Sequence, residues 1–141
     1  MIKKIYNELT KLSNKAFKNG DVPISALVIK ENKIISKGYN KKEKYKNPLL
    51  HAEIIAIEKA TKKTKDWRLN DCDLYTLLFP CPLCASLIAQ SRIKKVYYFY
   101  DTNNNKEKQI SLKILESVEL IKINSIESST FLKDFFNNIR K

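Results

Sequence analysis

The sequence has no apolar run long enough to cross a membrane. Its longest apolar stretches, such as Ile24 to Ile29 and Val96 to Tyr100, fall far short of the roughly 20 residues that a membrane-spanning helix requires. The first residues carry two lysines and soon meet further polar side chains, so the continuous apolar stretch of a secretory signal is missing. We therefore expect a cytoplasmic protein with no membrane partner.

Cysteine is also scarce, with only three in the chain. In a chain that reads as intracellular, so few cysteines favour metal binding or catalysis over a disulfide framework. Two of the three, Cys81 and Cys84, form a C-x-x-C motif.

No internal repeat, linker or low-complexity tract interrupts the 141 residues. A composition of 43% hydrophobic and 30% charged residues is ordinary for a globular protein and too apolar for a disordered chain. We expect one domain over residues 1–141.

Acidic residues are fewer than basic ones, 15 against 27, and the net charge is +12. Residues 1–70 contain 17 Lys and Arg against 7 Asp and Glu, whereas residues 71–141 contain 10 against 8. The basic clusters at 41–46 and 59–68 suit a polyanion such as a nucleic acid backbone. However, 24 of the 27 basic residues are Lys, which a coding bias also produces, and solvated lysines need no partner.

Hydrophobic periodicity predicts helices over residues 2–16, 51–63, 81–91, 109–116 and 127–139 and strands over residues 24–29, 33–39, 73–79, 95–100 and 118–123. The first helix should stop at Asn19–Gly20, and Pro80 should mark the start of the third. We expect polar loops at 41–48 and 101–105. The fold class is therefore α/β, a three-layer α/β/α arrangement with a five-stranded mixed sheet and helices on both faces. The helix between the fourth and fifth strands predicts that these two strands are parallel.

A set of metal-ligating side chains lies at two predicted helix starts. The only histidine, His51, opens one helix, with Glu53 two residues later, and Cys81 and Cys84 open the next. One imidazole and two thiolates match the three-ligand composition of a catalytic zinc site. A metal in front of both helix ends would be reached by His51, with Glu53 close enough to exchange protons with water there.

Other interpretations of these residues stay open at this stage. A lone C-x-x-C can be a redox pair, and a lone histidine is usually an ordinary packed or surface residue. Cys72 could supply a fourth ligand and give a closed structural zinc, although it more readily begins a strand as a small buried side chain.

The spacing H-x-E followed by P-C-x-x-C is the signature of the zinc nucleobase deaminases. The sequence resembles the bacterial tRNA-specific adenosine deaminase family, within the cytidine/deoxycytidylate deaminase superfamily, over most of its length. The matching segments are Gly20–Pro23, Gly38–Asn40, Asn47–Ile54, Arg68–Leu69, Leu74–Tyr75, Pro80–Ala85 and Ser91–Ile93.

The resemblance implies a cytidine-deaminase-like fold, one Zn²⁺ per subunit held by His51, Cys81 and Cys84, and Glu53 as the proton shuttle. It implies hydrolysis of adenosine to inosine at the wobble position of a tRNA anticodon stem-loop, and a homodimer. Its substrate contacts fall on four residues of this chain: Pro23, Asn40, Ala52 and Asp101.

Two departures from the family pattern concern the substrate side. Phe79 stands where the family has an acidic residue, and residues 97–108 are aromatic and polar where the family has small residues. A deaminase of free guanine, cytosine or deoxycytidylate with the same fold, and an inactive or structural-zinc RNA-binding module, remain alternatives. The aromatic run Tyr97–Tyr100 could stack on bases, but such strand aromatics are more often core.

Overall fold

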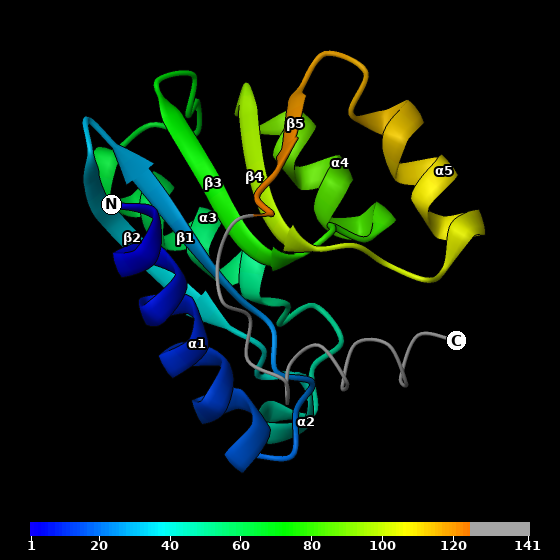
Figure 1. Ribbon diagram of the computed structural model, residues 1–141. Coiled ribbons are helices and arrows are strands. Elements are labelled where there is room, and N and C mark those ends of the chain that lie inside the picture. The colour runs from blue at the N-terminus through cyan, green and yellow to red at the C-terminus, as the bar shows by residue number, and fades with distance from the viewer. Residues whose placement is uncertain (125–141) are drawn as a thin grey trace.

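The computed structural model describes residues 1–124, which form one five-stranded sheet with helices on both faces (Figure 1). The sheet order is β2-β1-β3-β4-β5. In chain order the elements are α1 (Ile2–Lys18), β1 (Ser25–Lys30), β2 (Lys33–Tyr39), α2 (Lys42–Tyr45), α3 (Ala52–Thr64), β3 (Cys72–Leu78), α4 (Pro82–Gln90), β4 (Lys95–Tyr100), α5 (Asn105–Ile114) and β5 (Glu119–Lys122).

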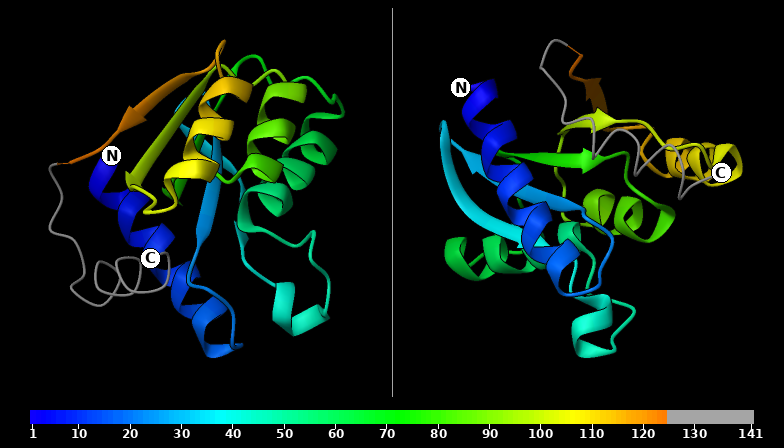
Figure 2. Two further views of the ribbon diagram at one scale, coloured as in Figure 1. Left: turned by 90° about the vertical axis from the view of Figure 1, so that its right-hand side faces the viewer. Right: turned by 60° about the horizontal axis from the view of Figure 1, so that its bottom comes forward.

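Strand β1 runs antiparallel to both of its neighbours, whereas β3, β4 and β5 are mutually parallel. The predicted parallel pairing of the last two strands is thus confirmed. Because parallel crossovers are right-handed, α3, α4 and α5 lie together on one face of the sheet, and α1 covers the other (Figure 2). Because β3 and β4 are parallel, their C-terminal ends lie at the same edge of the sheet.

Helix α1 packs a single apolar stripe on the sheet. Its buried residues recur every three or four positions: Ile5, Tyr6, Leu9, Leu12, Ser13 and Ala16. It ends at Lys18, and Gly20 follows with φ of +84°, a conformation that glycine adopts without steric cost. The predicted stop at Asn19–Gly20 is confirmed.

Strand β2 lets α3 approach its backbone very closely. A Cβ built on Gly38 would lie 2.3 Å from the carbonyl oxygen of Ala52 and 2.8 Å from the amide nitrogen of Ala56. On the same strand, the buried Ser36 hydroxyl donates to the Ala56 carbonyl at 2.7 Å. These contacts fix the depth at which α3, and with it His51, sits against the sheet.

One loop prediction and one helix start are wrong. The expected loop at 41–48 contains the short helix α2, because the buried Asp21 carboxylate accepts hydrogen bonds from the backbone N–H groups of Glu43 and Lys44. Helix α5 begins at Asn105 rather than 109, because Asn104 caps it by accepting from the N–H of Glu107. The helix predicted over 127–139 lies outside the described residues.

The aromatic run of β4 packs against neighbouring aromatic rings, with Phe99 buried in the core. Tyr97 stacks on Tyr75 with ring centroids 4.4 Å apart, and Phe99 packs against Tyr6 of α1 at 5.2 Å. The expectation that these aromatics fill the interior is confirmed for Phe99, whereas Tyr97, Tyr98 and Tyr100 are only partly buried. None of the helices within residues 1–124 has the length and apolarity needed to span a bilayer.

Candidate metal centre and active site

Three potential metal ligands stand at the starts of two neighbouring helices. His51 is the N-cap of α3, with φ −77° and ψ 149°, and Cys81 is the N-cap of α4, with φ −71° and ψ 167°. Cys84 lies one turn into α4. The predicted role of Pro80 is wrong by two residues, because Pro82 occupies the first helical position and Cys81 precedes it.

The ligand atoms are spaced as tetrahedral zinc requires. His51 Nδ1 lies 3.7 Å from Cys81 Sγ and 3.6 Å from Cys84 Sγ. Bonds of about 2.0 Å to nitrogen and about 2.3 Å to sulfur would separate these atoms by about 3.6 Å around a tetrahedral ion. Within residues 1–124 the group contains only these three ligands, all within 4.8 Å of one another. Three protein ligands leave a fourth position for water, which is the composition of a catalytic site.

The charges of the three groups depend on one another. The pKa of Cys81 is lowered to about 4, first because the Cys84 thiol donates a hydrogen bond to its sulfur and then because of its contact with His51. The pKa of Cys84 is raised by the same hydrogen bond and by burial. The pKa of His51 is raised, chiefly by its hydrogen bond with Cys81. The pair thus favours one ionised and one neutral sulfur, and a bound divalent cation would favour ionisation of both.

Glu53 is a buried carboxylate beside this group. It is only 4% exposed, and its charge adds to the hydrogen bond with Cys81 and to burial in raising the pKa of the neighbouring Cys84 thiol. It occupies the first turn of α3, where the backbone amides favour negative charge. A buried acid next to a three-ligand metal group is placed to exchange protons with water or substrate there.

Asn40 and Ala52 form one buried contact at the start of α3. The Asn40 side-chain oxygen accepts from the Ala52 N–H at 2.8 Å, and the backbone N–H of Asn40 donates to Ile24. Asn40 is 9% exposed, Ala52 is fully buried, and Pro23 is buried just before β1. The contact ties the end of β2 to the helix that begins with the His51 ligand.

The structure excludes Cys72 as a fourth ligand. Cys72 begins β3, whereas Cys81 and Cys84 follow the other end of that strand, about 20 Å away at 3.3 Å per residue. Cys72 is 1% exposed, and its burial is the main cause that raises the pKa of its thiol to about 11. It is the small buried strand residue that the sequence favoured, so the closed Cys₃His alternative is wrong.

Asp101 lies where β4 ends, next to the turn that carries Cys81. The backbone N–H of Phe79 donates to the Tyr100 carbonyl at 2.9 Å, which holds the two strand ends together. Asp101 is exposed, and its carboxylate accepts from Lys108 at 2.7 Å. Phe79 is buried and meets Tyr98 edge to face at 5.1 Å.

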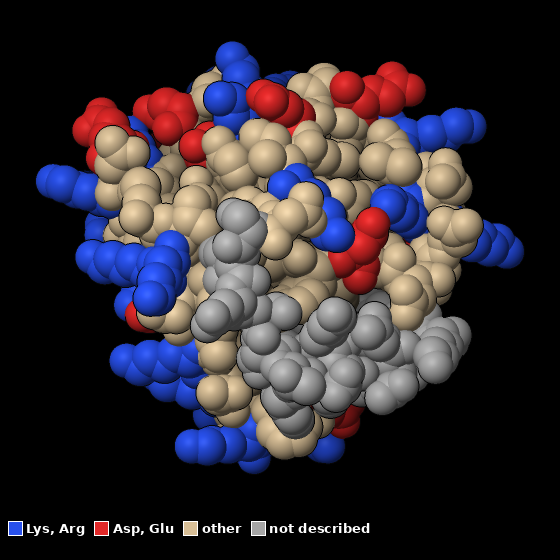
Figure 3. Space-filling model, viewed as in Figure 1, with Lys and Arg blue, Asp and Glu red and all other residues tan. Residues whose placement is uncertain are grey.

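Basic side chains are spread over the surface and are dense along α1 and α2 (Figure 3). Figure 3 shows Lys and Arg along the side formed by α1 and α2, whereas acidic residues cluster at the opposite end of the sheet. The lysines at positions 42, 44 and 46 are exposed on or beside α2. The hydrogen bond with Cys81 raises the pKa of His51, and the charge of Lys42 acts in the opposite direction. A polyanion could therefore approach next to the metal ligands.

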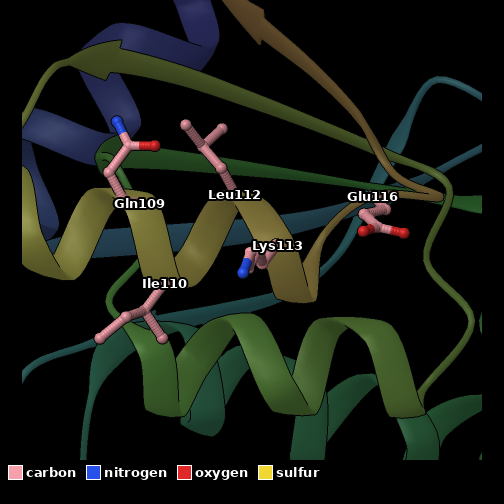
Figure 4. Close-up of a pocket in the computed structure, with 5 residues that line it drawn as sticks. All are labelled: Gln109, Ile110, Leu112, Lys113 and Glu116. Carbon is pink, nitrogen blue, oxygen red and sulfur yellow. The ribbon is translucent and has the colours of Figure 1, made fainter.

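Three surface hollows of the described part of the chain lie away from this group of residues. One, on α5, is lined by Gln109, Ile110, Leu112, Lys113 and Glu116 (Figure 4). A second lies between α3 and α4 beside Trp67, and a third lies near the start of β4 and β5. None of the three is lined by His51, Cys81, Cys84 or Glu53.

Sequence reasoning found the ligands and the acid but missed residues that hold them in place. Gly38 carried a signal, since it is one of only two glycines and interrupts a strand pattern. Asp21 lies in the family-like segment Gly20–Pro23, but nothing in the sequence pointed to its contact with Glu43, 22 residues away, or to that of Lys108 with Asp101.

Comparisons with known proteins agree with this geometry. A family model described as MafB19-like deaminase matches residues 2–140. The tRNA-specific adenosine deaminase of Rickettsia bellii is 37% identical over 142 residues, which cover 94% of this chain and 98% of that protein. The corresponding protein of Rickettsia felis is 34% identical, with coverage of 89% and 93%.

Solved structures show the same fold. A structure from work on A-to-I editing by tRNA:A34 deaminases superposes with a TM-score of 0.76 at 23% identity, covering 87% of this chain and all of the other. Guanine deaminase from Bacillus subtilis gives 0.68 at 27% identity, with coverage of 94% and 90%. The chain belongs to the tRNA-specific adenosine deaminases of the cytidine/deoxycytidylate deaminase superfamily.

Proposed function

We propose that this protein hydrolyses adenosine to inosine and ammonia at the wobble position of tRNA. The observation that carries the proposal is the convergence of one imidazole and two thiols, spaced at 3.6 and 3.7 Å, beside a buried glutamate. The similarity to tRNA-specific adenosine deaminases over nearly the whole length of both chains points to the substrate class.

We assign His51, Cys81 and Cys84 as the ligands of one Zn²⁺, whose fit to their spacing and donor types is described above. When bound, zinc supplies Lewis-acid activation of water. The N-termini of α3 and α4 both point at this position, and their free amides stabilise negative charge that develops there.

Glu53 moves the protons of the reaction. Its carboxylate accepts a proton from the attacking water and delivers it to N1 of the adenine ring as the C6–O bond forms. It then moves the proton of the new C6 hydroxyl to the departing amino group, so that C6–N cleavage releases ammonia and leaves the C6 carbonyl of inosine. Burial of Glu53 suits this role, since proton transfer is most effective when the acid is desolvated and close to the reacting atoms.

The base-binding residues are assigned from the family resemblance, and the contacts of Asn40 support the assignment. Asn40 uses its side-chain oxygen on the Ala52 N–H, which leaves its amide NH₂ to donate to the flipped base. Pro23 and Ala52 provide buried surface next to it. We assign Asp101, at the end of β4, to a contact with the neighbouring nucleotides.

A deaminase of free bases is the second candidate, because the guanine deaminase from Bacillus subtilis has the same fold. The two are separated by incubating the zinc-loaded protein with an anticodon stem-loop carrying adenosine at position 34, and separately with guanine, cytosine and deoxycytidylate. Inosine formed only from the stem-loop supports the proposal. Turnover of a free base without turnover of the stem-loop contradicts it.

We also expect the protein to act as a homodimer. Apolar side chains on α4 and α5 remain exposed, with Leu83 at 44%, Ile110 at 45% and Leu112 at 37%. Figure 4 shows Ile110 directed toward α4 and Leu112 on the other side of α5. Sedimentation equilibrium should give twice the chain mass, and a mass of 16.4 kDa would contradict the expectation.

A further inference from the structure

The connection between β4 and α5 is held by an ion pair. Lys108 Nζ, on the second turn of α5, lies 2.7 Å from an Asp101 carboxylate oxygen, and the two side chains are 24% and 37% exposed. Within residues 1–124 this is the only ion pair of either residue, and each of the other pairs has at least one side chain that is half exposed or more. The pair is therefore less screened by water than the others.

The ammonium group of Lys108 lies against the ring of Phe79. It lies 5.3 Å from the centroid of the Phe79 ring, and Phe79 packs edge to face on Tyr98. The pKa of Tyr98 is raised first by burial and then by the charge of Asp101, while Lys108 acts in the opposite direction. Both charges are thus within electrostatic range of Tyr98, and the ring of Phe79 attracts the cation.

The short segment between Asp101 and α5 has its own hydrogen bonds. The second carboxylate oxygen of Asp101 accepts from the Thr102 N–H, and the Thr102 hydroxyl accepts from the Asn104 N–H. Asn104 then exchanges two hydrogen bonds with Glu107, accepting from its N–H and donating to its carboxylate. Both oxygens of Asp101 are therefore engaged, and Lys108 supplies the one charged partner.

The position of Phe79 ties this arrangement to the metal ligands. Phe79 is two residues before Cys81, and its backbone N–H is hydrogen bonded to the residue before Asp101. An acidic side chain at position 79 would compete with Asp101 for the Lys108 ammonium. With phenylalanine there, the ammonium is directed to Asp101 alone.

We propose that Lys108 is a positioning residue that holds Asp101 at the rim of the site, so that its carboxylate can accept hydrogen bonds from a nucleotide next to the reacting adenosine. This inference rests on the proposed function. Carboxylate oxygens can each accept more than one hydrogen bond, so the pairing with Lys108 and Thr102 leaves capacity for a ribose hydroxyl or a base amine. Lys108 acts through Asp101 and not through a phosphate.

The test is a double-mutant cycle between positions 101 and 108. The variants are Lys108→Met, Lys108→Arg, Asp101→Asn and the double variant Asp101→Asn/Lys108→Met. Lys106→Met, an exposed lysine on the same helix, removes the same charge without touching Asp101. The KM and kcat for an adenosine-34 stem-loop are measured, together with stem-loop affinity in a Glu53→Gln background and the salt dependence of that affinity.

We expect Lys108→Met to raise KM and weaken affinity by about three- to tenfold with kcat unchanged, and Lys108→Arg to restore both. In the Asp101→Asn background, Lys108→Met should have no further effect, and Lys106→Met should have little effect in either background. An equal loss with and without Asp101, accompanied by a shallower salt dependence, would mean a direct phosphate contact and would overturn the inference. No loss at all would also overturn it.

Failure of the proposed function has a different signature. If the unmodified protein neither binds nor deaminates the stem-loop, the function itself is refuted and the role of Lys108 falls with it. If the unmodified protein is active but the cycle is additive, only the role of Lys108 is refuted.

Discussion

The metal-ligand turns and the polar connections beside them are built in different ways. At the start of α3, Ala52 and Glu53 are buried. The Ala52 backbone lies close to Gly38 and donates a hydrogen bond to the Asn40 side chain. In the connection just before it, Tyr45 and Leu49 are each 56% exposed. The first region is held by buried contacts, whereas the second is an exposed surface that also carries Lys42, Lys44 and Lys46.

The largest effect should come from Glu53. Glu53→Gln keeps the size of the side chain but removes proton transfer, so we expect kcat to fall by about 10³-fold while zinc content stays at one per chain. Glu58→Gln, an exposed residue of the same helix, serves as the matched control. Activity is followed as inosine formed from the stem-loop, and zinc by mass spectrometry of the native protein. Retained turnover in Glu53→Gln would remove the acid–base role.

Gly38→Ala should produce the largest loss of stability. A Cβ placed 2.3 Å from the Ala52 carbonyl must push α3 away from β2, and we expect about 3 kcal/mol less free energy of unfolding and weakened zinc binding. Gly20→Ala is the control, because it has open space and only the cost of a positive φ, about 1 kcal/mol. Urea unfolding measures both. Equal losses at the two glycines would show that the close approach of α3 is unimportant.

Loss of lysines beside α2 should affect RNA affinity without affecting the chemistry. Lys42→Met and Lys44→Met are each expected to weaken stem-loop binding several-fold, to reduce its salt slope by about 1 and to leave kcat unchanged. Lys33→Met, at the β1–β2 turn, removes the same charge elsewhere. If all three variants weaken binding equally, the lysines act only through net charge.

These two regions also differ in how far the sequence predicts them. The ligands and Glu53 lie within short motifs at helix starts, where capping and dipole effects act over a few residues, and the structure brings them together. The parallel pairing of β4 and β5 followed from the length of their connection, whereas the pairing of β1 with β3 was not predicted. By contrast, α2 depends on a carboxylate 22 residues earlier in the chain, and the start of α5 depends on the cap at Asn104, so periodicity alone could not place either.

The smallest effect concerns the far end of β3. Because burial raises the pKa of Cys72 to about 11, its thiol stays protonated in the folded protein at pH values where the unfolded chain, with a thiol pKa of about 8.5, has released the proton. The free energy of unfolding should therefore decrease as pH rises from about 8.5 toward 11, and less so in Cys72→Ala. Alkylation of Cys72 at pH 8 should be at least about tenfold slower in folded than in unfolded protein. Equal rates would contradict its burial.

The most direct measurement is zinc K-edge X-ray absorption on the zinc-loaded protein and on Cys72→Ser. The account predicts one zinc with one nitrogen and two sulfur ligands from the chain, one exchangeable oxygen ligand, and the same spectrum in both proteins. A third sulfur ligand, a fourth protein ligand that does not exchange, or no stoichiometric zinc would contradict it.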